Sequence, residues 1–224
     1  MIVVIGSPIG RLADGVISAG GTASRVALAA AGAGRTVQLV GKTGDDATAD
    51  AVVLDLARGG VGHVALLRDP ARATPLESPP DPDDEPAGLE ASEPDGSPAA
   101  GSSPVANPDG PALEAADVDL GLRYLTDFAV VVLAESGTAD VAGIVAEAAR
   151  WGEARLVLVV RPGEKAPDRL QPDAVVFEAP TTDPDGVFAA LVGAFAAALD
   201  DGAEPGEAFR ASIASDGWTE AADD

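Results

Sequence analysis

Six short runs rich in Val, Ile and Leu recur along the chain, separated by longer Ala-rich segments. Continuous apolar runs of about four to eight residues are typical of strands buried on both faces of a parallel sheet. The runs that predict strands are residues 2–5, 36–41, 63–69, 128–136, 154–163 and 172–180. Because helical segments lie between most of them, the pattern predicts an α/β fold with a largely parallel sheet.

Five segments have the composition and the end signals of helices. Residues 22–34 follow a diglycine and end among glycines, and residues 44–60 place Asp45 or Asp46 near the N-cap. The other helical segments are residues 141–150, 187–199 and 204–215. The start, MIVVIGSPIG, has no basic region before its apolar run, so it predicts a first strand and not a signal peptide.

Residues 75–112 differ in character from the segments on either side. They hold ten of the chain's 18 prolines and many Asp and Glu residues, and no Lys or Arg lies between Arg72 and Arg123. Such a segment cannot bury enough apolar surface to offset the entropy lost on ordering. We expect a disordered insertion that divides one domain into residues 1–74 and 113–224. Its role is that of a solvated loop or, alternatively, of a docking segment for a basic protein partner.

Charge and composition exclude several classes of function. The formal net charge of −23 disfavours nucleic acid and anionic membrane surfaces as partners. The chain has no Cys and a single histidine, His63, so we expect no disulfide, no histidine-based triad and no metal site. No apolar run reaches the roughly 18 residues of a membrane-spanning helix. These features favour a cytoplasmic protein.

Two glycine-containing turns are candidates for ligand binding. Gly20 and Gly21 precede a helix, where bare backbone lets N–H groups approach a ligand closely. The alternative is a tight turn before a closely packed helix. Gly186 opens a second small-residue turn ahead of the helix at 187–199, and a turn of this kind at a helix start suits an anion.

The stretch GGTASRVALAAAGAGRTVQLVGKTGDD, residues 20–46, resembles the first signature of the ribokinase/PfkB carbohydrate kinase family. The matching positions are Gly20, Gly21, Ala23, Ala27, Gly34 and Gly44. Residues 59–75 resemble the segment that follows in those kinases. Residues 183–195 align with the C-terminal signature through Asp183, Gly186, Val192, Gly193 and Ala194. The resemblance implies a ribokinase-like, Rossmann-type three-layer α/β sandwich with a mostly parallel sheet.

The C-terminal signature departs from the family at its reactive centre. The family sequence is Gly-Ala-Gly-Asp, in which the N–H groups form an anion hole and the Asp accepts the proton of the sugar hydroxyl. The corresponding residues here are Gly186, Val187, Phe188 and Ala189. Base catalysis contributes roughly 10²–10⁴-fold and oxyanion-type stabilisation roughly 10²–10³-fold. These departures from the family sequence imply that residues 186–189 are a remnant of the anion hole and that the protein is catalytically inactive.

Other departures fall in the substrate and metal sites that the resemblance implies. Arg25 replaces an Asn, Arg11 replaces a substrate-holding Asp, and the magnesium-linked Asn-x-x-Glu motif has no counterpart, so we expect no metal. The residues between the first strand and Gly20 look like a short loop, which implies a reduced or absent substrate lid. The strands and helix that precede the C-terminal signature in the family also look missing.

These departures leave two hypotheses for function. In the first, the protein is a binding or regulatory module without a cofactor, and Gly20, Gly21, Arg11 and Arg25 bind a small anion such as a sugar phosphate. Guanidinium groups favour phosphate over neutral hydroxyls; the alternative is that both arginines are solvated surface charges. In the alternative, the protein is an active carbohydrate or nucleoside kinase that uses ATP and Mg²⁺, with Asp185 as a relocated base.

Overall fold

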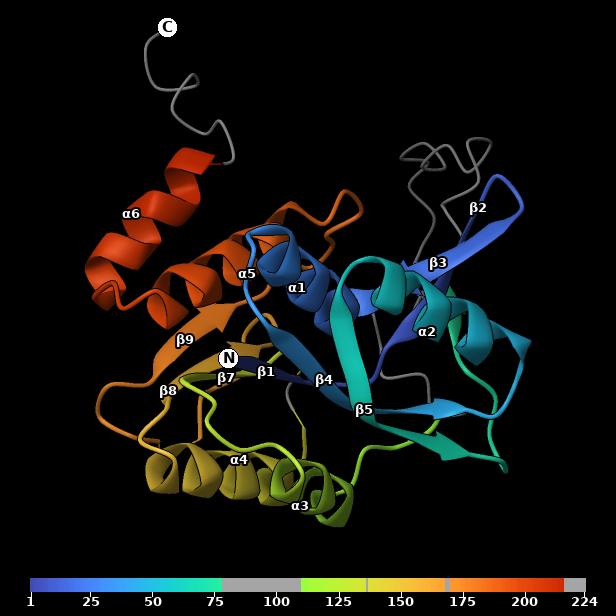
Figure 1. The fold of residues 1–224 in the computed structure, drawn as a ribbon, viewed down its shortest axis with the longest axis horizontal. Helices are drawn as coiled ribbons and strands as arrows, with labels where there is room; N and C mark the ends of the chain where they lie inside the picture. Colours follow the sequence, from blue (N-terminus) through green and yellow to red (C-terminus); the bar gives the residue numbers. More distant parts are fainter. Residues whose placement is uncertain (78–109, 136, 168–169, 216–224) are drawn as a thin grey trace, which may run out of the picture.

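Six parallel strands form the central sheet of the protein (Figure 1). The structure, a computed structural model, describes residues 1–77, 110–135, 137–167 and 170–215. The strands are β1 Ile2–Ile5, β4 Val37–Gly44, β5 Val61–Asp69, β7 Val130–Leu133, β8 Arg155–Val160 and β9 Val175–Glu178, in the order β5-β4-β1-β7-β8-β9. Every neighbouring pair is parallel. The α/β fold class expected from the apolar runs is confirmed.

The central strands are buried because helices cover both faces of the sheet. All four residues of β1 and all four of β7 are buried, and so are five of the six residues of β8. One face packs on α1 (Gly21–Gly32), α2 (Ala47–Arg58) and α5 (Val187–Asp200), with α6 (Pro205–Ser215) outside α5. The other face packs on α3 (Ala115–Arg123) and α4 (Ala139–Trp151), and Figure 1 shows the two helical layers above and below the sheet.

A second, three-stranded sheet projects from the end of β1. It contains β2 (Ile9–Ala13), β3 (Val16–Gly20) and β6 (Leu76–Glu77), in the order β3-β2-β6. The expectation of a short loop between the first strand and Gly20 is therefore wrong. Asp14 and Gly15 both have positive φ, 51° and 74°, and an Asp-Gly pair between apolar residues is the sequence signal for a two-residue hairpin turn.

Two other expectations concern segments between the main elements. No helix or strand lies between β9 and α5, as the sequence predicted, so β9 forms an edge of the sheet. The predicted insertion at residues 75–112 lies mostly outside the described residues, although β6 occupies its first positions. Within the described ranges, every helix is too short or too polar to cross a membrane.

Candidate functional site

The strand order creates a switch point at the carboxyl ends of β1 and β7. The chain passes from β1 to β4 on one side, whereas β7 pairs with β1 on the other side. Ligands of open α/β sheets bind in the crevice at such a point, because the connections diverge there. Gly6 follows β1, and the N–H of Ala134, after β7, donates to the carbonyl of Ile5 at 2.9 Å. The two strand ends therefore lie side by side at this edge.

The first glycine turn lies at this edge and begins α1. Gly20 is the N-cap, and Gly21, with φ of 76°, adopts a left-handed conformation that glycine accepts without strain. A Cβ at Gly6 would approach the Cβ of Ala23 to 2.8 Å, so the start of α1 packs directly on the end of β1. The diglycine thus permits close packing of helix on strand as well as exposed backbone N–H groups.

The second glycine turn begins α5, and a carboxylate of the protein already binds its N–H groups. Gly186 is the N-cap in the left-handed region, with φ of 73°. The two carboxylate oxygens of Asp183 accept hydrogen bonds from the N–H groups of Phe188 and Ala189, each at 3.1 Å. A negative group at a helix start is stabilised by the helix dipole. Asp183 therefore provides the anion that this turn is suited to bind.

Arg25 of α1 connects the α5 turn with the small sheet. Its guanidinium donates to the main-chain carbonyl of Asp183 and forms an ion pair with Glu77, with 2.8 Å between Nη2 and Oε1. A Cβ at Gly20 would lie 2.7 Å from the Oε1 of Glu77, and a Cβ at Gly186 would lie 3.1 Å from the Cδ of Arg25. The Arg25–Glu77 pair therefore occupies the space over both glycine turns.

Three solved structures have a similar fold. Ribokinase from Arabidopsis thaliana, complexed with ribose and ATP, has a TM-score of 0.61 and 15% identity over 96% of this chain and 91% of that chain. Phosphofructokinase-2 from Escherichia coli, in complex with substrates and products, gives the same four values. A PfkB protein from Polaromonas sp. JS666 has a TM-score of 0.61 and 13% identity over 96% of each chain.

The protein has a ribokinase-like fold. The sequence itself matches no protein-family model and no curated protein. The fold confirms the resemblance at the level of architecture, and it includes the mostly parallel sheet expected from the two signatures.

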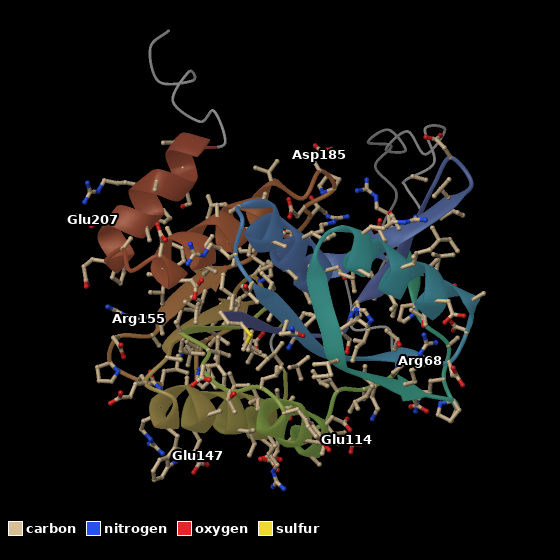
Figure 2. The ribbon with its side chains drawn as sticks, viewed as in Figure 1. Arg68, Glu114, Glu147, Arg155, Asp185 and Glu207 are labelled. Atoms are coloured by element: carbon tan, nitrogen blue, oxygen red, sulfur yellow. The ribbon has the colours of Figure 1, made fainter. Side chains whose placement is uncertain are left out.

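Within the ribokinase-like fold, the residues aligned with the family's reactive centre differ in exposure. Ala189 is fully buried and belongs to the core beneath α5. Val187 is 41% exposed, whereas Phe188 is half-buried, with its ring edge-on to Phe177 at 6.5 Å between centroids. Asp185 is exposed on the turn before the helix, at the upper margin of the molecule (Figure 2).

Arg11 lies in β2 beside this cluster. It is half-buried, and among the described residues its guanidinium has no hydrogen-bond or ion-pair partner. Arg11 and Glu77 are in register on neighbouring strands, so their side chains project from the same face of the small sheet. Glu77 therefore shares a face of the small sheet with Arg11 but forms its ion pair with Arg25.

Glu135, the acidic residue at the switch point, is not among the site residues predicted from the sequence. It follows β7, and its side chain lies 3.6 Å from the position of a Cβ on Gly6. Crowding by protein atoms raises the pKa of this carboxyl to about 7, and a hydrogen bond from the Ser7 N–H opposes the rise. The residue is nevertheless exposed, so its carboxyl is open to a ligand. The signal in the sequence that could have identified Glu135 is an acidic residue just after a buried strand.

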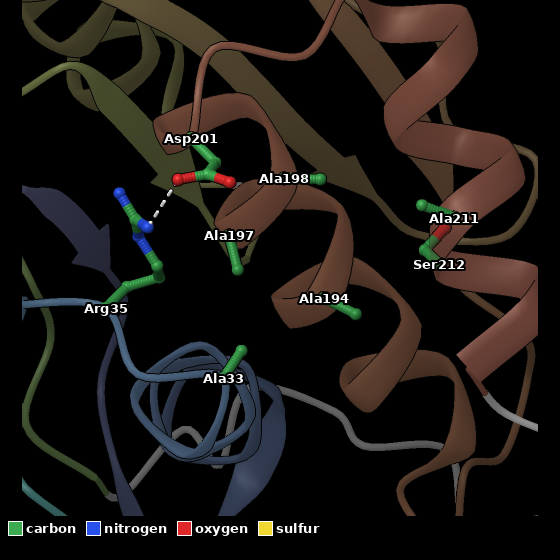
Figure 3. A pocket seen from close by; sticks show the side chains of 8 residues that line it. All are labelled: Ala33, Arg35, Ala194, Ala197, Ala198, Asp201, Ala211 and Ser212. Carbon is green, nitrogen blue, oxygen red and sulfur yellow. Dashed lines mark hydrogen bonds and ion pairs between the residues drawn. The ribbon is translucent and has the colours of Figure 1, made fainter.

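Two cavities lie away from this cluster. One, of about 260 Å³, is formed by alanines of α1, α5 and α6, with the Arg35–Asp201 ion pair at its margin (Figure 3). The other, of about 740 Å³, lies along the small residues of α4. Among the described residues, no group of three His, Cys, Asp or Glu side chains is placed to hold a metal ion.

Proposed function

We propose that this protein binds a small anionic ligand, in the chemical class of sugar phosphates, and does not transfer a phosphoryl group. The ligand would lie at the carboxyl edge of the sheet, between the start of α1, the start of α5 and the small sheet. The observation that most favours binding without phosphoryl transfer is the pair of 3.1 Å hydrogen bonds from the N–H groups of Phe188 and Ala189 to the carboxylate of Asp183.

These hydrogen bonds bear on catalysis in two ways. A transferred phosphoryl group needs donors aimed at its developing charge, and at α5 two of those donors already bind a carboxylate. The side chain that follows them is the buried methyl group of Ala189, which accepts no proton. Among the described residues, no group of three His, Cys, Asp or Glu side chains is placed to hold Mg²⁺, and we derive no step through an ATP–magnesium complex.

The charges at the edge favour a phosphate-bearing ligand. Arg11 is half-buried and without a partner among the described residues, so a phosphate there would gain charge-assisted hydrogen bonds. Glu135, exposed and with a raised pKa, offers a carboxyl that both donates and accepts hydrogen bonds near neutral pH, as a sugar hydroxyl requires. The two groups supply the two kinds of contact that a sugar phosphate needs.

Calorimetry with ribose 5-phosphate, inorganic phosphate and free ribose tests the proposal. We expect ribose 5-phosphate to bind most tightly, and Arg11→Ala to weaken it roughly tenfold, because one charge-assisted contact is lost. Arg123→Ala serves as the matched control, since Arg123 is 72% exposed on α3 and, within the part of the chain that the structure describes, forms an ion pair only with Asp119 of its own helix. The absence of binding by all three ligands would exclude this function.

A second candidate function is an active sugar or nucleoside kinase with a relocated base. Glu135 favours it, because an accessible acid whose pKa is raised to about 7 at a switch point has the properties of a general base. Asp185, the relocated base expected from the sequence, lies on the exposed turn beside Gly186. Turnover of ATP that depends on a sugar and on either acid would favour this alternative.

A further inference from the structure

We propose that Glu77 is an internal anion held by Arg25, and that an anionic ligand displaces it and thereby releases strand β6 from the small sheet. The inference rests on the proposed anion-binding function and adds a mechanical consequence to it. Binding at the edge of the main sheet would change the structure of the chain at residues 75–77.

The first observation is the position of the Arg25–Glu77 pair. The two side chains are 18% and 34% exposed, so the pair is neither fully solvated nor sealed from a ligand. The oxygen of Glu77 that binds Arg25 lies against Gly20, and the methylene of Arg25 lies against Gly186. Glu77 therefore occupies the place over the diglycine that a ligand anion would take.

The second observation is that Arg25 has two anchors. One guanidinium nitrogen donates to the carbonyl of Asp183, and the other binds Glu77. If Glu77 leaves, the bond to Asp183 keeps the guanidinium in place at the start of α5. A phosphate carries more charge and more acceptor oxygens than a carboxylate, so it competes well for the freed side of the guanidinium fork.

The third observation is the weak attachment of β6. This strand has two residues, and its register with β2 comprises two pairs, Gly10 with Leu76 and Arg11 with Glu77. The N–H of Gly10 donates to the carbonyl of Pro75 at 2.8 Å, and Leu76 is 44% exposed. So short an edge strand has little to hold it once its ion pair is lost.

The chain before β6 is anchored much more firmly. The N–H of Thr74 donates to the carboxylate of Asp46 at 2.7 Å, and the hydroxyl of Thr74 accepts from the N–H of Gly44 at 2.9 Å. The same Asp46 caps α2 through the N–H of Ala49, at 2.8 Å. Because of these bonds, release would stop at Thr74.

The test combines calorimetry with hydrogen exchange on the full chain, using inorganic phosphate and ribose 5-phosphate as probes. Glu77→Gln removes the internal anion and keeps the size of the side chain. Glu204→Gln is the matched control, because it also breaks an Arg–Glu ion pair. Glu204 pairs with Arg155, with 3.3 Å between Oε1 and Nη2, at the opposite end of the sheet from Glu77. Thermal melting confirms that both variants are folded.

We expect Glu77→Gln to bind either probe roughly fivefold more tightly than the parent chain, and Glu204→Gln to bind as the parent does. Phosphate should increase exchange at the amides of Leu76, Glu77 and Gly10 in the parent chain. In Glu77→Gln, exchange there should be high without a ligand.

Two results would overturn the inference, and they differ in what they say about function. If the parent chain binds the probes and exchange at the amides of Leu76, Glu77 and Gly10 does not change, the coupling is wrong and the anion site stands. If neither the parent nor Glu77→Gln binds any probe, the anion site and the coupling fail together.

Discussion

Arg25 and Glu77, 52 positions apart in the chain, form an ion pair of 2.8 Å that closes the space over two glycine turns. The pair joins α1 to the last residue of β6, and Arg25 also reaches the carbonyl of Asp183 at the start of α5. The positions at which the family resemblance implies a sugar are thus filled by the protein's own charged side chains. A ligand of the proposed class would compete at this edge with contacts that the protein already makes.

Gly193 is expected to be essential for the packing of α5 on α1. A Cβ there would lie 2.6 Å from the Cβ of Ala29 and 2.7 Å from the carbonyl oxygen of Val26, and backbone cannot easily move aside. We expect Gly193→Ala to lower the free energy of unfolding by about 2 kcal/mol, despite the better helix propensity of alanine. Urea denaturation measures the change.

Gly143→Ala in α4 is the control for that substitution. A Cβ at Gly143 would meet nothing within 4 Å, so only the propensity gain remains, and stability should rise by about 0.5–1 kcal/mol. Equal effects of the two substitutions would show that α5 does not pack on α1 as closely as described.

Asp200 is expected to stabilise the protein at neutral pH and not in acid. Burial would raise the pKa of its carboxyl, but hydrogen bonds from the N-terminal ammonium and Arg35, each at 2.8 Å, outweigh burial and hold the pKa below 3.8. A carboxyl whose pKa is lowered by folding stabilises the folded state at pH values above its ordinary pKa. This stabilisation is lost as the pH falls below 3.8. Asp200→Asn should therefore cost about 2 kcal/mol at pH 7 and much less near pH 2.

Asp201→Asn separates this effect from a general loss of charge. Asp201 binds the same arginine at 2.8 Å but is 76% exposed, so its removal should cost less than about 0.5 kcal/mol. Denaturation curves of both variants between pH 2 and pH 7 make the comparison. A pH-independent difference between Asp200→Asn and the parent chain would contradict the assignment.

Glu135 is expected to reduce stability as the pH rises. Its pKa is about 7 in the folded protein against 4.5 ordinarily, so the unfolded chain releases the proton first and stability falls between pH 4.5 and about 7. Glu135→Gln removes this loss. Since the residue is exposed, solvent screening reduces the gain to roughly 1 kcal/mol at pH 8, or about 2–4 °C in the melting temperature. Melting curves at pH 4 should show no gain, and a gain at both pH values would argue against a titrating Glu135.

Ala189→Asp is expected to destabilise the protein without restoring phosphoryl transfer. The side chain of Ala189 is fully buried beside the core of α5, so a carboxylate there would be desolvated without a partner. We expect a loss of about 3 kcal/mol or more in the free energy of unfolding. The protein would need a rearranged α5 start to use the new acid, and sugar-dependent ATP turnover by this variant would show that such a rearrangement occurs.

The main sheet follows directly from the sequence because its strands are buried on both faces. Runs such as Ile2–Ile5 and Val130–Leu133 have no polar position, and burial of every residue is what such runs require. The N-cap at Asp46 was also readable, since its carboxylate accepts from the N–H of Ala49. By contrast, α3 and β6 were missed, because α3 has only nine residues, one of them Gly121, and β6 is too short to form a pattern.

The charged contacts of the candidate site depend on strand order, which the sequence does not show. Glu135 lies beside Gly6 because β7 pairs with β1. Glu77 contacts Arg25 because β6 pairs with β2 of the hairpin. The glycine positions were predictable from local turn chemistry, as Gly186 with its positive φ illustrates. Contacts between residues that are distant in the sequence could be identified only from the three-dimensional structure.

The most direct measurement for the central claim is Mg²⁺-dependent ADP formation from ATP, with a panel of sugars and nucleosides, by the full chain and by Glu135→Gln and Asp185→Asn. Our account predicts that no sugar or nucleoside raises the rate above the rate with ATP alone, and that neither variant differs from the parent chain. ADP formation that depends on a sugar and is abolished by either substitution would contradict it.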